Sequence, residues 1–338
     1  MGLIANEIVA QVLERSDIVE LISGYVVLKR AGRNFKALCP FHHEKSSSFV
    51  VSPDKQIFHC FGCGAGGNAI GFVMMQEKLE FPEAVRFLAE KAGVVIAEIN
   101  TPKSPSALWK DEVLKLNGLA VEYFHLNLLS KSDPDVKNAR DYLKDRGVRL
   151  EDVKQFKLGF SMDEWDGLLN FLKSAHVDLK FIERSGLVIA RENKQGYYDR
   201  FRDRIVFPIF DVKSQCVGFG ARTMKDEKGA KYINSPDTPA YTKGHHLFGL
   251  HVTRHGIVKK DQAIIVEGYM DMIIPYQFGV DNIVASLGTA LTNEQIRLLH
   301  RYTNNVVMLF DSDVAGQAAI VRNLDVLIEQ GMNVRVAS

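Results

Sequence analysis

The chain has 338 residues and a net charge of +1, with 46% hydrophobic and 25% charged residues, which is typical of a soluble globular protein of two or three domains. No apolar run reaches the length of a membrane span, and the N-terminus lacks the pattern of a signal peptide, so we expect a cytoplasmic protein without a membrane partner. Because the net charge is close to zero, a nucleic acid would have to bind local basic patches.

Residues 1–100 predict a small zinc-ribbon domain built around two close pairs of metal-binding side chains. Cys39 and His42 form the first pair, and Cys60 and Cys63 form the second. The strand-like runs between the pairs predict a β-hairpin. Two ligand pairs separated by a hairpin are typical of a closed tetrahedral site for one structural Zn²⁺.

Two alternatives to this zinc site are weaker. His43 could replace His42, but only His42 repeats the two-residue gap between Cys60 and Cys63. A disulfide is not expected, because a cytoplasmic protein keeps its thiols reduced and the number of cysteines in this region is odd. The remaining cysteine, Cys216, lies in an apolar strand-like run and is expected to be a buried, inert thiol.

Basic and aromatic residues are interleaved in the same domain, which favours binding of a single nucleic-acid strand by charge and base stacking. The basic residues are Lys29, Arg30, Arg33, Lys36, Lys45 and Lys55, and the aromatic residues are Phe35, Phe41, Phe49 and Phe58. The alternative is that the aromatic side chains form the core of the domain. Helical patterns at residues 69–76 and 81–91 complete it.

A proline-containing polar segment predicts a linker at residues 101–110, and residues 111–260 predict a mixed α+β domain. Its helical patterns lie at residues 113–129, 138–144, 166–175 and 179–185, and its strand patterns lie at residues 187–189, 204–210 and 216–221.

Cations gather in the second half of this domain. Arg200, Arg202 and Arg204 alternate in the sequence, so they would share one face of a strand. Further cations follow at strand or loop ends: Arg222, Lys231 and Lys243. We interpret this group as a basic wall that holds phosphate groups. The alternative is a set of solvated ion pairs with Asp199, Asp203 and Asp211.

Residues 261–338 predict a doubly wound α/β domain with a parallel sheet, because helical and strand patterns alternate at short spacing. The strand patterns lie at residues 263–266, 282–285, 305–310 and 333–336, and the helical patterns lie at residues 270–278, 293–302 and 315–330. Thr292 and Gln295 predict a capping box for the second helix. The sequence stops directly after a strand, so we expect a fragment of a longer chain.

Carboxylates follow two of these predicted strands. Glu267 comes directly after the first strand, and Asp311 and Asp313 come after the third. Open α/β sheets bind ligands at the carboxyl ends of their strands, so these side chains would converge if the two strands are neighbours. Converging carboxylates without a basic neighbour favour a hard divalent cation such as Mg²⁺. The alternative is that each acid only caps a helix.

Three motifs resemble known families. Glu267-Gly-Tyr-Met-Asp271 with Asp311-Ser-Asp313 resembles the Toprim pattern, which primases share with topoisomerases and some nucleases. The Cys39-Pro-Phe-His42 and Cys60-Phe-Gly-Cys63 segments resemble the zinc-binding domain of bacterial primases of the DnaG type. The segments that begin at Arg200, Lys231 and Lys243 resemble the RNA polymerase core of the same primases. The similarity extends along the whole chain, and the combination of motifs excludes the topoisomerases.

This resemblance implies a primase, an enzyme that synthesises short RNA primers on single-stranded DNA at the replication fork from ribonucleoside triphosphates. It implies Zn²⁺ at Cys39, His42, Cys60 and Cys63. It also implies catalytic Mg²⁺, with Mn²⁺ as an alternative, at Glu267, Asp311 and Asp313, with support from Asp271. The residues implied to contact template, nucleotide or primer are Arg146, Arg200, Arg202, Arg222, Lys231 and Lys243. Residues 111–260 would be the N-terminal subdomain of the polymerase core.

The chain departs from the primase family in two respects. Ser47 stands where the family usually has proline. The family also continues, beyond the position of Ser338, into an acidic loop, a helical subdomain and a domain that binds the replicative helicase, so that partner is expected only for a full-length protein. We expect a monomer. The alternative functions are a Toprim nuclease that depends on magnesium and a catalytically inactive, zinc-dependent module that binds single-stranded DNA.

Overall fold

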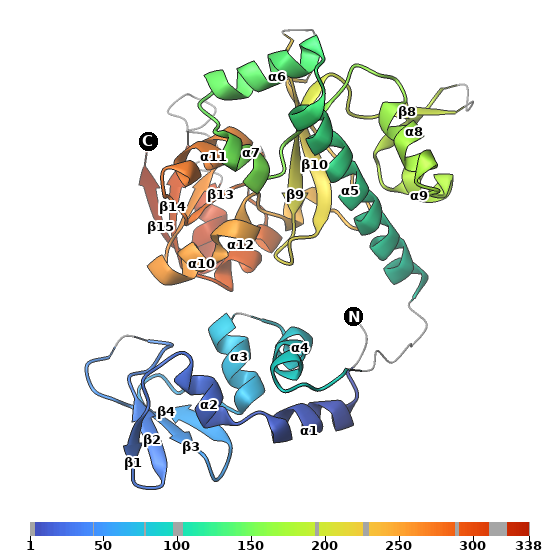
Figure 1. Cartoon of the computed structure of the whole chain (residues 1–338). Coiled ribbons are helices and arrows are strands. Elements are labelled where there is room, and N and C mark those ends of the chain that lie inside the picture. The colour runs from blue at the N-terminus through green and yellow to red at the C-terminus, as the bar shows by residue number, and fades with distance from the viewer. Residues whose placement is uncertain are drawn as a thin grey trace. The chain divides into compact units, whose positions relative to one another are not determined.

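Figure 1 shows the computed structural model of the chain. The structure describes residues 4–42, 44–77, 79–96, 104–192, 196–225, 230–287, 291–310 and 323–337. The chain forms two compact units, residues 1–103 and residues 104–338. Within the described ranges, no helix is both long enough and apolar enough to cross a bilayer.

The first unit contains a five-stranded antiparallel sheet in the order β1-β2-β3-β4-β5. The strands are β1 (Lys29–Ala31), β2 (Asn34–Ala37), β3 (Phe49–Ser52), β4 (Ile57–Cys60) and β5 (Gly66–Gly67). The helices are α1 (Asn6–Arg15), α2 (Ile18–Ser23), α3 (Ala69–Glu77) and α4 (Phe81–Lys91). The predicted hairpin is formed by β3 and β4, so the secondary structure expected for this region is confirmed.

Aromatic side chains form the core of the first unit. Phe49, Phe58 and Phe72 are buried, and the centroids of their rings lie 5.3–6.4 Å apart. Phe35 and Phe41 pack against the same cluster. The alternative interpretation of these aromatics is therefore correct for Phe49 and Phe58, because a buried ring is not accessible to a nucleic-acid base.

The second unit combines antiparallel and parallel sheets with surrounding helices. The helices are α5 (Pro105–Ser130), α6 (Pro134–Asp145), α7 (Leu150–Gln155), α8 (Gly167–Ser174), α9 (Leu179–Arg184), the 3₁₀ helix η1 (Lys243–His245), α10 (Leu250–Lys260), α11 (Tyr269–Gln277) and α12 (Asn293–His300). The strands are β6 (Gly159–Ser161), β7 (Val188–Ala190), β8 (Tyr197–Asp199), β9 (Arg204–Phe210), β10 (Cys216–Thr223), β11 (Tyr232–Asn234), β12 (Ala263–Val266), β13 (Ile283–Ala285), β14 (Asn305–Leu309) and β15 (Asn333–Ala337).

Helix α5 begins earlier than predicted. Ser104 caps it by accepting a hydrogen bond of 3.2 Å from the backbone N–H of Ala107, and Pro105 occupies the first turn, where a missing N–H has no cost. Residues 105–110 are therefore helical, whereas the sequence predicted a linker there and a helix start at residue 113. The side chain of Asn117 donates to the carbonyl groups of Cys216 and Val217 and thereby fixes α5 on strand β10.

A four-stranded antiparallel sheet in the order β11-β10-β9-β6 lies beside α5. Strands β9 and β10 are almost entirely buried, because the sheet is covered by hydrophobic clusters on both faces. Cys216 is buried in β10, as expected. Strands β6, β8 and β11 and helices α7 and α10 have no counterpart among the predicted elements.

The C-terminal sheet has the order β13-β12-β14-β15, and all its strand pairs are parallel. Strand β12 lies between β13 and β14, and its residues Ala263, Ile265 and Val266 are buried. The predicted capping box of α12 is present, since Thr292 and Gln295 exchange side-chain to backbone hydrogen bonds. The doubly wound parallel fold class is confirmed. Of the helix predicted at residues 315–330, the structure describes residues 323–329 as helical.

Candidate functional site

The predicted zinc ligands lie together in the first unit. Each of Cys39, His42, Cys60 and Cys63 offers one ligand atom, and these four atoms lie within 4.8 Å of one another. Sγ of Cys39 is 3.8 Å from Sγ of Cys63, which is far longer than a disulfide bond. Three thiol groups and one imidazole match the donor set of a closed structural zinc site.

The local chain positions these ligands in two turns. Cys60 ends strand β4 and Cys63 lies in the turn that follows, while Cys39 and His42 follow strand β2. The alternative ligand His43 lies outside the described residues. The ring of His59, which also neighbours the site in sequence, instead contacts the exposed ring of Phe61 at 4.7 Å.

His42 has a defined orientation in the site. Its Nδ1 is 3.8 Å from Sγ of Cys60, whereas its Nε2 is 3.4 Å from Oε2 of Glu44. Glu44 also accepts hydrogen bonds from the backbone of Cys39 and from the backbone and hydroxyl of Ser48. The hydrogen bonds from Ser48 are the main reason that the pKa of Glu44 lies below its ordinary value. No pattern in the sequence marked Glu44 or Ser48 as part of this site, although Glu44 is only two residues from His42.

At the Toprim-like motif, Glu267 directly follows strand β12 and is half-buried. Asp271 lies in the first turn of α11, where its Oδ2 accepts a hydrogen bond of 3.1 Å from the backbone N–H of Gly268. Strand β14 runs parallel to β12 as its neighbour and ends at Leu309. Asp311 and Asp313 lie outside the described residues, so their arrangement with Glu267 stays a prediction.

Two of the predicted cations form a cluster with aromatic rings. The guanidinium group of Arg222 lies 4.5 Å from the ring centroid of Tyr142 and 5.6 Å from that of Tyr232. Arg146 lies over the same Tyr142 ring at 5.4 Å. Arg222 is only 6% exposed, and its Nε has no hydrogen-bond partner among the residues that the structure describes. We call Arg146, Arg222, Tyr142 and Tyr232 the arginine–tyrosine cluster.

The arginine–tyrosine cluster adjoins the Toprim-like motif. Burial raises the pKa of Tyr232, while the charges of Arg222 and Arg146 lower it and that of Asp271 raises it, so these groups act on one another. The ring of Tyr232 also lies 6.0 Å from that of Tyr269, the first residue of α11. Neither tyrosine could be assigned to this site from the sequence, because Tyr142 and Tyr232 are distant in sequence from Glu267.

The other predicted cations occupy different positions. Lys231 is exposed directly before β11, and Lys243 is half-buried at the start of η1. Arg200 is half-buried, and its Nε donates a hydrogen bond of 2.7 Å to the carbonyl of Gly186. Burial lowers the pKa of the Arg200 guanidinium.

The prediction that Arg200, Arg202 and Arg204 share a strand face is wrong. Strand β8 ends at Asp199 and β9 begins at Arg204, and the backbone between them turns at Asp203, which has a φ of 50°. The three side chains therefore have different surroundings. Arg204 donates to the carbonyl groups of Ala230 and Lys231, near the hairpin of β10 and β11.

Arg202 belongs to a second group of cations and aromatic rings. Its guanidinium lies 3.6 Å from the ring centroid of Trp165 and 5.2 Å from that of Tyr198. Arg191 lies near the same two rings, at 5.7 and 5.9 Å. Trp165 is 56% exposed, so part of its ring is accessible to a ligand although Arg202 lies over it. We call these four residues the tryptophan cluster; of them, only Arg202 was predicted from the sequence.

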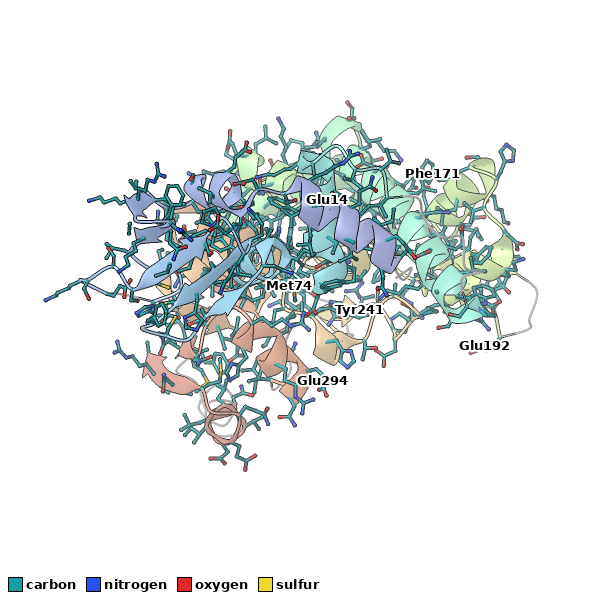
Figure 2. All side chains as sticks on the ribbon, turned by 90° about the horizontal axis from the view of Figure 1, so that it is seen from below. Glu14, Met74, Phe171, Glu192, Tyr241 and Glu294 are labelled. Carbon is teal, nitrogen blue, oxygen red and sulfur yellow. The ribbon has the colours of Figure 1, made fainter. Side chains whose placement is uncertain are left out.

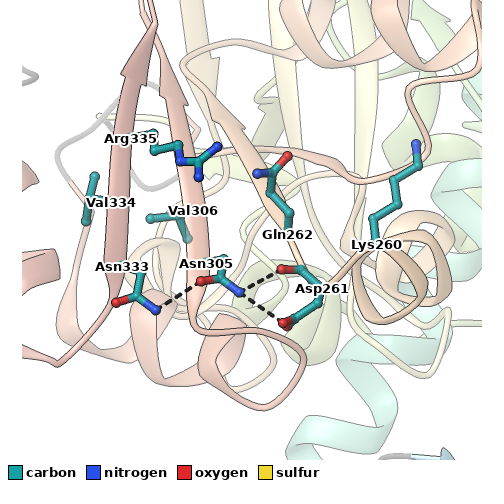
Figure 3. A pocket seen from close by; sticks show the side chains of 8 residues that line it. All are labelled: Lys260, Asp261, Gln262, Asn305, Val306, Asn333, Val334 and Arg335. Carbon is teal, nitrogen blue, oxygen red and sulfur yellow. Dashed lines mark hydrogen bonds between the residues drawn. The ribbon is translucent and has the colours of Figure 1, made fainter. Parts of the chain in front are cut away.

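A pocket of about 620 Å³ lies at the amino ends of the strands of the parallel sheet (Figure 3). It is lined by Gln262, Asn305 and Asn333, which lie at the amino ends of β12, β14 and β15. Asn333 donates to Asn305, which in turn donates to Asp261, so the polar side chains largely satisfy one another (Figure 3). Glu267 is at the carboxyl end of β12, so this pocket is distinct from the predicted acidic site.

Three family models match successive parts of the chain. Residues 4–104 match the CHC2 zinc finger, residues 123–254 match the N-terminal domain of the DNA primase catalytic core, and residues 264–338 match a Toprim-like domain. The three matches follow one another along the chain in this order. They also agree with the positions of the Cys/His group and of the parallel sheet.

Named relatives agree with these matches. The chain is 44% identical to a DNA primase of Clostridium acetobutylicum over 99% of its own length and 55% of the relative. Its fold is similar to the zinc-binding and RNA polymerase domains of the Aquifex aeolicus primase, with a TM-score of 0.63 and 35% identity over 97% of this chain and 78% of that one. It is also similar to a DnaG primase catalytic domain bound to single-stranded DNA, with a TM-score of 0.61 and 32% identity over 68% of this chain and 71% of that one.

The chain spans about half the length of the curated relatives it matches. The similarity nevertheless includes nearly all of its own residues, at identities of 42–44% for the first relatives. The matched parts comprise the zinc finger, the catalytic core and the Toprim-like domain. The chain belongs to the DNA primase family.

Proposed function

We propose that this protein synthesises short RNA primers on single-stranded DNA from ribonucleoside triphosphates. The observation that carries the proposal is the proximity of the Toprim-like motif to the arginine–tyrosine cluster within one unit. A nucleotidyl transfer needs both signs of charge: carboxylates for a metal ion and cations for the phosphate oxygens. Relatives named DNA primase support this function over the nuclease alternative.

The acidic residues supply the catalytic centre in this proposal. Glu267, Asp311 and Asp313 would hold Mg²⁺, which, when bound, polarises the α-phosphate and stabilises the pyrophosphate that leaves. Carboxylate oxygens are the ligands that Mg²⁺ prefers, so the donor set fits, and Mn²⁺ is an alternative. Asp271 would act indirectly, since its carboxylate fixes the backbone of Gly268 and so the turn that carries Glu267.

The arginine–tyrosine cluster would bind the triphosphate of the incoming nucleotide. Arg222 is buried, and its guanidinium group lies over the rings of Tyr142 and Tyr232, which restrict its movement. Its N–H donors are therefore already oriented before phosphate oxygens bind. Binding then costs less side-chain entropy than binding by a flexible cation would. Lys231 and Lys243 would add charge for the phosphates of the nucleotide or primer.

The tryptophan cluster would hold the template strand. An exposed indole with two neighbouring guanidinium groups offers a stacking surface for a base and positive charge for the adjacent phosphates. Arg200 would support this region by fixing the chain at Gly186. The solved DnaG catalytic domain bound to single-stranded DNA supports this class of ligand.

The zinc finger would contribute a second surface for the template. In its sheet the register aligns Lys29 with Lys36, Lys36 with Val50, and Val50 with His59, so these side chains share one face. This face bears two lysines, and the exposed Phe61 contacts His59. Zn²⁺ held by Cys39, His42, Cys60 and Cys63 would stabilise the fold that presents this surface.

The cellular location, oligomeric state and partner protein are proposed from the family. Membership of the primase family supports a cytoplasmic location. We also propose a monomer that, in full-length form, works with the replicative helicase.

The function is tested by incubating the complete protein with single-stranded DNA, labelled ribonucleotides and Mg²⁺. Primer synthesis predicts labelled RNA whose length is limited by the template, and no shortening of end-labelled DNA. DNA degradation without incorporation would support the nuclease instead. Binding of DNA that persists without Mg²⁺, with no incorporation at any Mg²⁺ concentration, would support a non-catalytic binding module.

A further inference from the structure

One carboxylate contacts the surroundings of the Cys/His group at several points. Oε1 of Glu44 accepts hydrogen bonds from the backbone N–H of Cys39 at 2.8 Å and from that of Ser48 at 3.1 Å. Oε2 accepts a hydrogen bond of 2.5 Å from the hydroxyl of Ser48 and lies 3.4 Å from Nε2 of His42. The Glu44 side chain is only 9% exposed, so these contacts replace water around a charged group.

These contacts lead to three of the four predicted ligands. Cys39 is held through its backbone, and His42 is held through the ring nitrogen that faces away from Cys60. Cys60 is reached through Ser48, whose hydroxyl lies 3.1 Å from the Cys60 sulfur. A surface glutamate without a structural role would not have such a set of partners, because an exposed ion pair gains little from a fixed geometry.

The position of Glu44 beside Nε2 of His42 favours Nδ1 as the nitrogen that binds a metal. A protonated Nε2 that donates to the Glu44 carboxylate leaves Nδ1 unprotonated, and Nδ1 is the nitrogen on the side of Cys60. A carboxylate behind a ligating histidine fixes the ring and makes the imidazole a stronger ligand. Gly62 allows the ring to lie there, since a Cβ at this position would be 2.6 Å from Nε2 of His42.

We propose that Glu44 is the positioning residue of the zinc site, and that it orients His42 directly and Cys60 through Ser48. The inference rests on the proposed binding of zinc by Cys39, His42, Cys60 and Cys63, and it adds a residue outside that ligand set. Removal of such a carboxylate typically lowers metal affinity by about 10- to 100-fold.

The test measures the apparent Kd for Zn²⁺ of the whole chain by competition with a chromogenic chelator. Glu44→Ala is expected to weaken zinc binding by about 10- to 100-fold, and Ser48→Ala is expected to weaken it less. Glu44→Gln keeps the shape of the side chain and loses its charge, so an intermediate loss is expected. If Glu44→Ala does not fold, the zinc affinity of Glu44→Gln tests the proposal instead. Glu90→Gln, which changes an exposed glutamate of α4, is the matched control and should bind zinc like the wild type.

A second readout follows the histidine ring itself. In the zinc-loaded wild type, nitrogen-15 spectra of labelled histidine should show His42 bound through Nδ1, with a slowly exchanging proton on Nε2. In Glu44→Ala this proton should exchange faster, because its acceptor has been removed.

Two results separate failure of the inference from failure of the ligand assignment. If Cys60→Ser leaves the zinc content unchanged, the assignment of the ligands is wrong. If Cys60→Ser removes zinc, while Glu44→Ala and Glu44→Gln keep the wild-type Kd and His42 exchange rate, the positioning role of Glu44 is overturned.

Discussion

The hydroxyl group of Tyr269 donates a hydrogen bond of 2.7 Å to Oδ1 of Asn234. Tyr269 begins helix α11 two residues after Glu267, and Asn234 ends strand β11, which also carries Tyr232 of the arginine–tyrosine cluster. The Tyr269 ring is buried and stacks on that of Phe207 at 4.7 Å. This bond therefore connects the turn that bears the proposed metal ligand to the strand that bears the proposed nucleotide contacts.

Tyr269→Phe should destabilise the second unit by about 1–3 kcal/mol, because the variant leaves the Asn234 oxygen without its buried donor. It should also reduce primer synthesis, since β11 and α11 lose the hydrogen bond that joins them. Tyr241→Phe is the control: Tyr241, which is labelled in Figure 2, is also buried, and its hydroxyl has no hydrogen-bond partner among the described residues. Urea unfolding measures the stabilities, and equal values for both variants would contradict the prediction.

Gly220→Ala should disturb the same connection from strand β10. A Cβ at Gly220 would lie 1.9 Å from the hydroxyl oxygen of Tyr269, so the tyrosine must move away from Asn234. We expect a loss of about 1–3 kcal/mol of stability, typical of overpacking in a core. Gly118→Ala in α5 has no neighbour within 4 Å and should instead stabilise the helix by about 0.5–1 kcal/mol. A Gly220→Ala protein as stable as the wild type would contradict this account.

Arg222→Lys keeps the charge of the arginine–tyrosine cluster but loses the planar group that lies over the rings of Tyr142 and Tyr232. The KM for ribonucleotides in primer synthesis should rise by about tenfold, the equivalent of about 1.4 kcal/mol. Arg297→Lys, an exposed position on α12, should leave the KM unchanged. An unchanged KM in Arg222→Lys would mean that Arg222 supports the fold and not the nucleotide.

Asp199 should make the stability of the second unit depend on pH. It is buried and accepts hydrogen bonds from the backbone of Leu168 and Leu169, and burial raises its pKa from 3.8 to about 6. The folded state thus binds more protons than the unfolded state between these values. The contribution of Asp199 to stability therefore falls, by up to about 3 kcal/mol, as the pH rises from about 4 to about 6.

The measurement is urea unfolding of the wild type and of Asp199→Asn across this pH range. The free energy of unfolding of Asp199→Asn should increase relative to that of the wild type as the pH rises. Asp178 is a control of opposite sign, because its side-chain and backbone hydrogen bonds with Lys180 lower its pKa. Asp178→Asn should be less stable than the wild type at neutral pH, and this difference in the free energy of unfolding should shrink as the pH falls. A constant difference for Asp199→Asn would show that the carboxylate titrates normally.

Much of the fold follows from local patterns, and the missed elements are those for which such patterns are weak. The parallel sheet was predictable because its strands are short apolar runs separated by amphipathic helices. Strand β6, in contrast, has three residues and is buried on all sides, so no alternation marks it. The sequence predicts helix α5 too short, because Pro105 and Pro102 together suggest a linker, although proline is favoured in a first helical turn.

The same limit applies to the site. Ligand spacing in the sequence was enough to bring Cys39, His42, Cys60 and Cys63 together. The alternation of Arg200, Arg202 and Arg204 was misleading, because the turn at Asp203 depends on a left-handed backbone conformation that the sequence does not mark. The partners of Arg222 come from other elements of the fold, so only the tertiary structure identifies them.

The most direct test of the proposed function is primer synthesis by Glu267→Gln in the complete protein. The carboxamide keeps the size of the side chain but is a poor ligand for Mg²⁺, so incorporation of labelled ribonucleotides should fall by at least about a hundredfold, while binding of single-stranded DNA persists. Glu294→Gln, at an exposed position of α12 (Figure 2), should keep wild-type activity. Wild-type incorporation by Glu267→Gln would contradict a catalytic centre at the carboxyl end of β12.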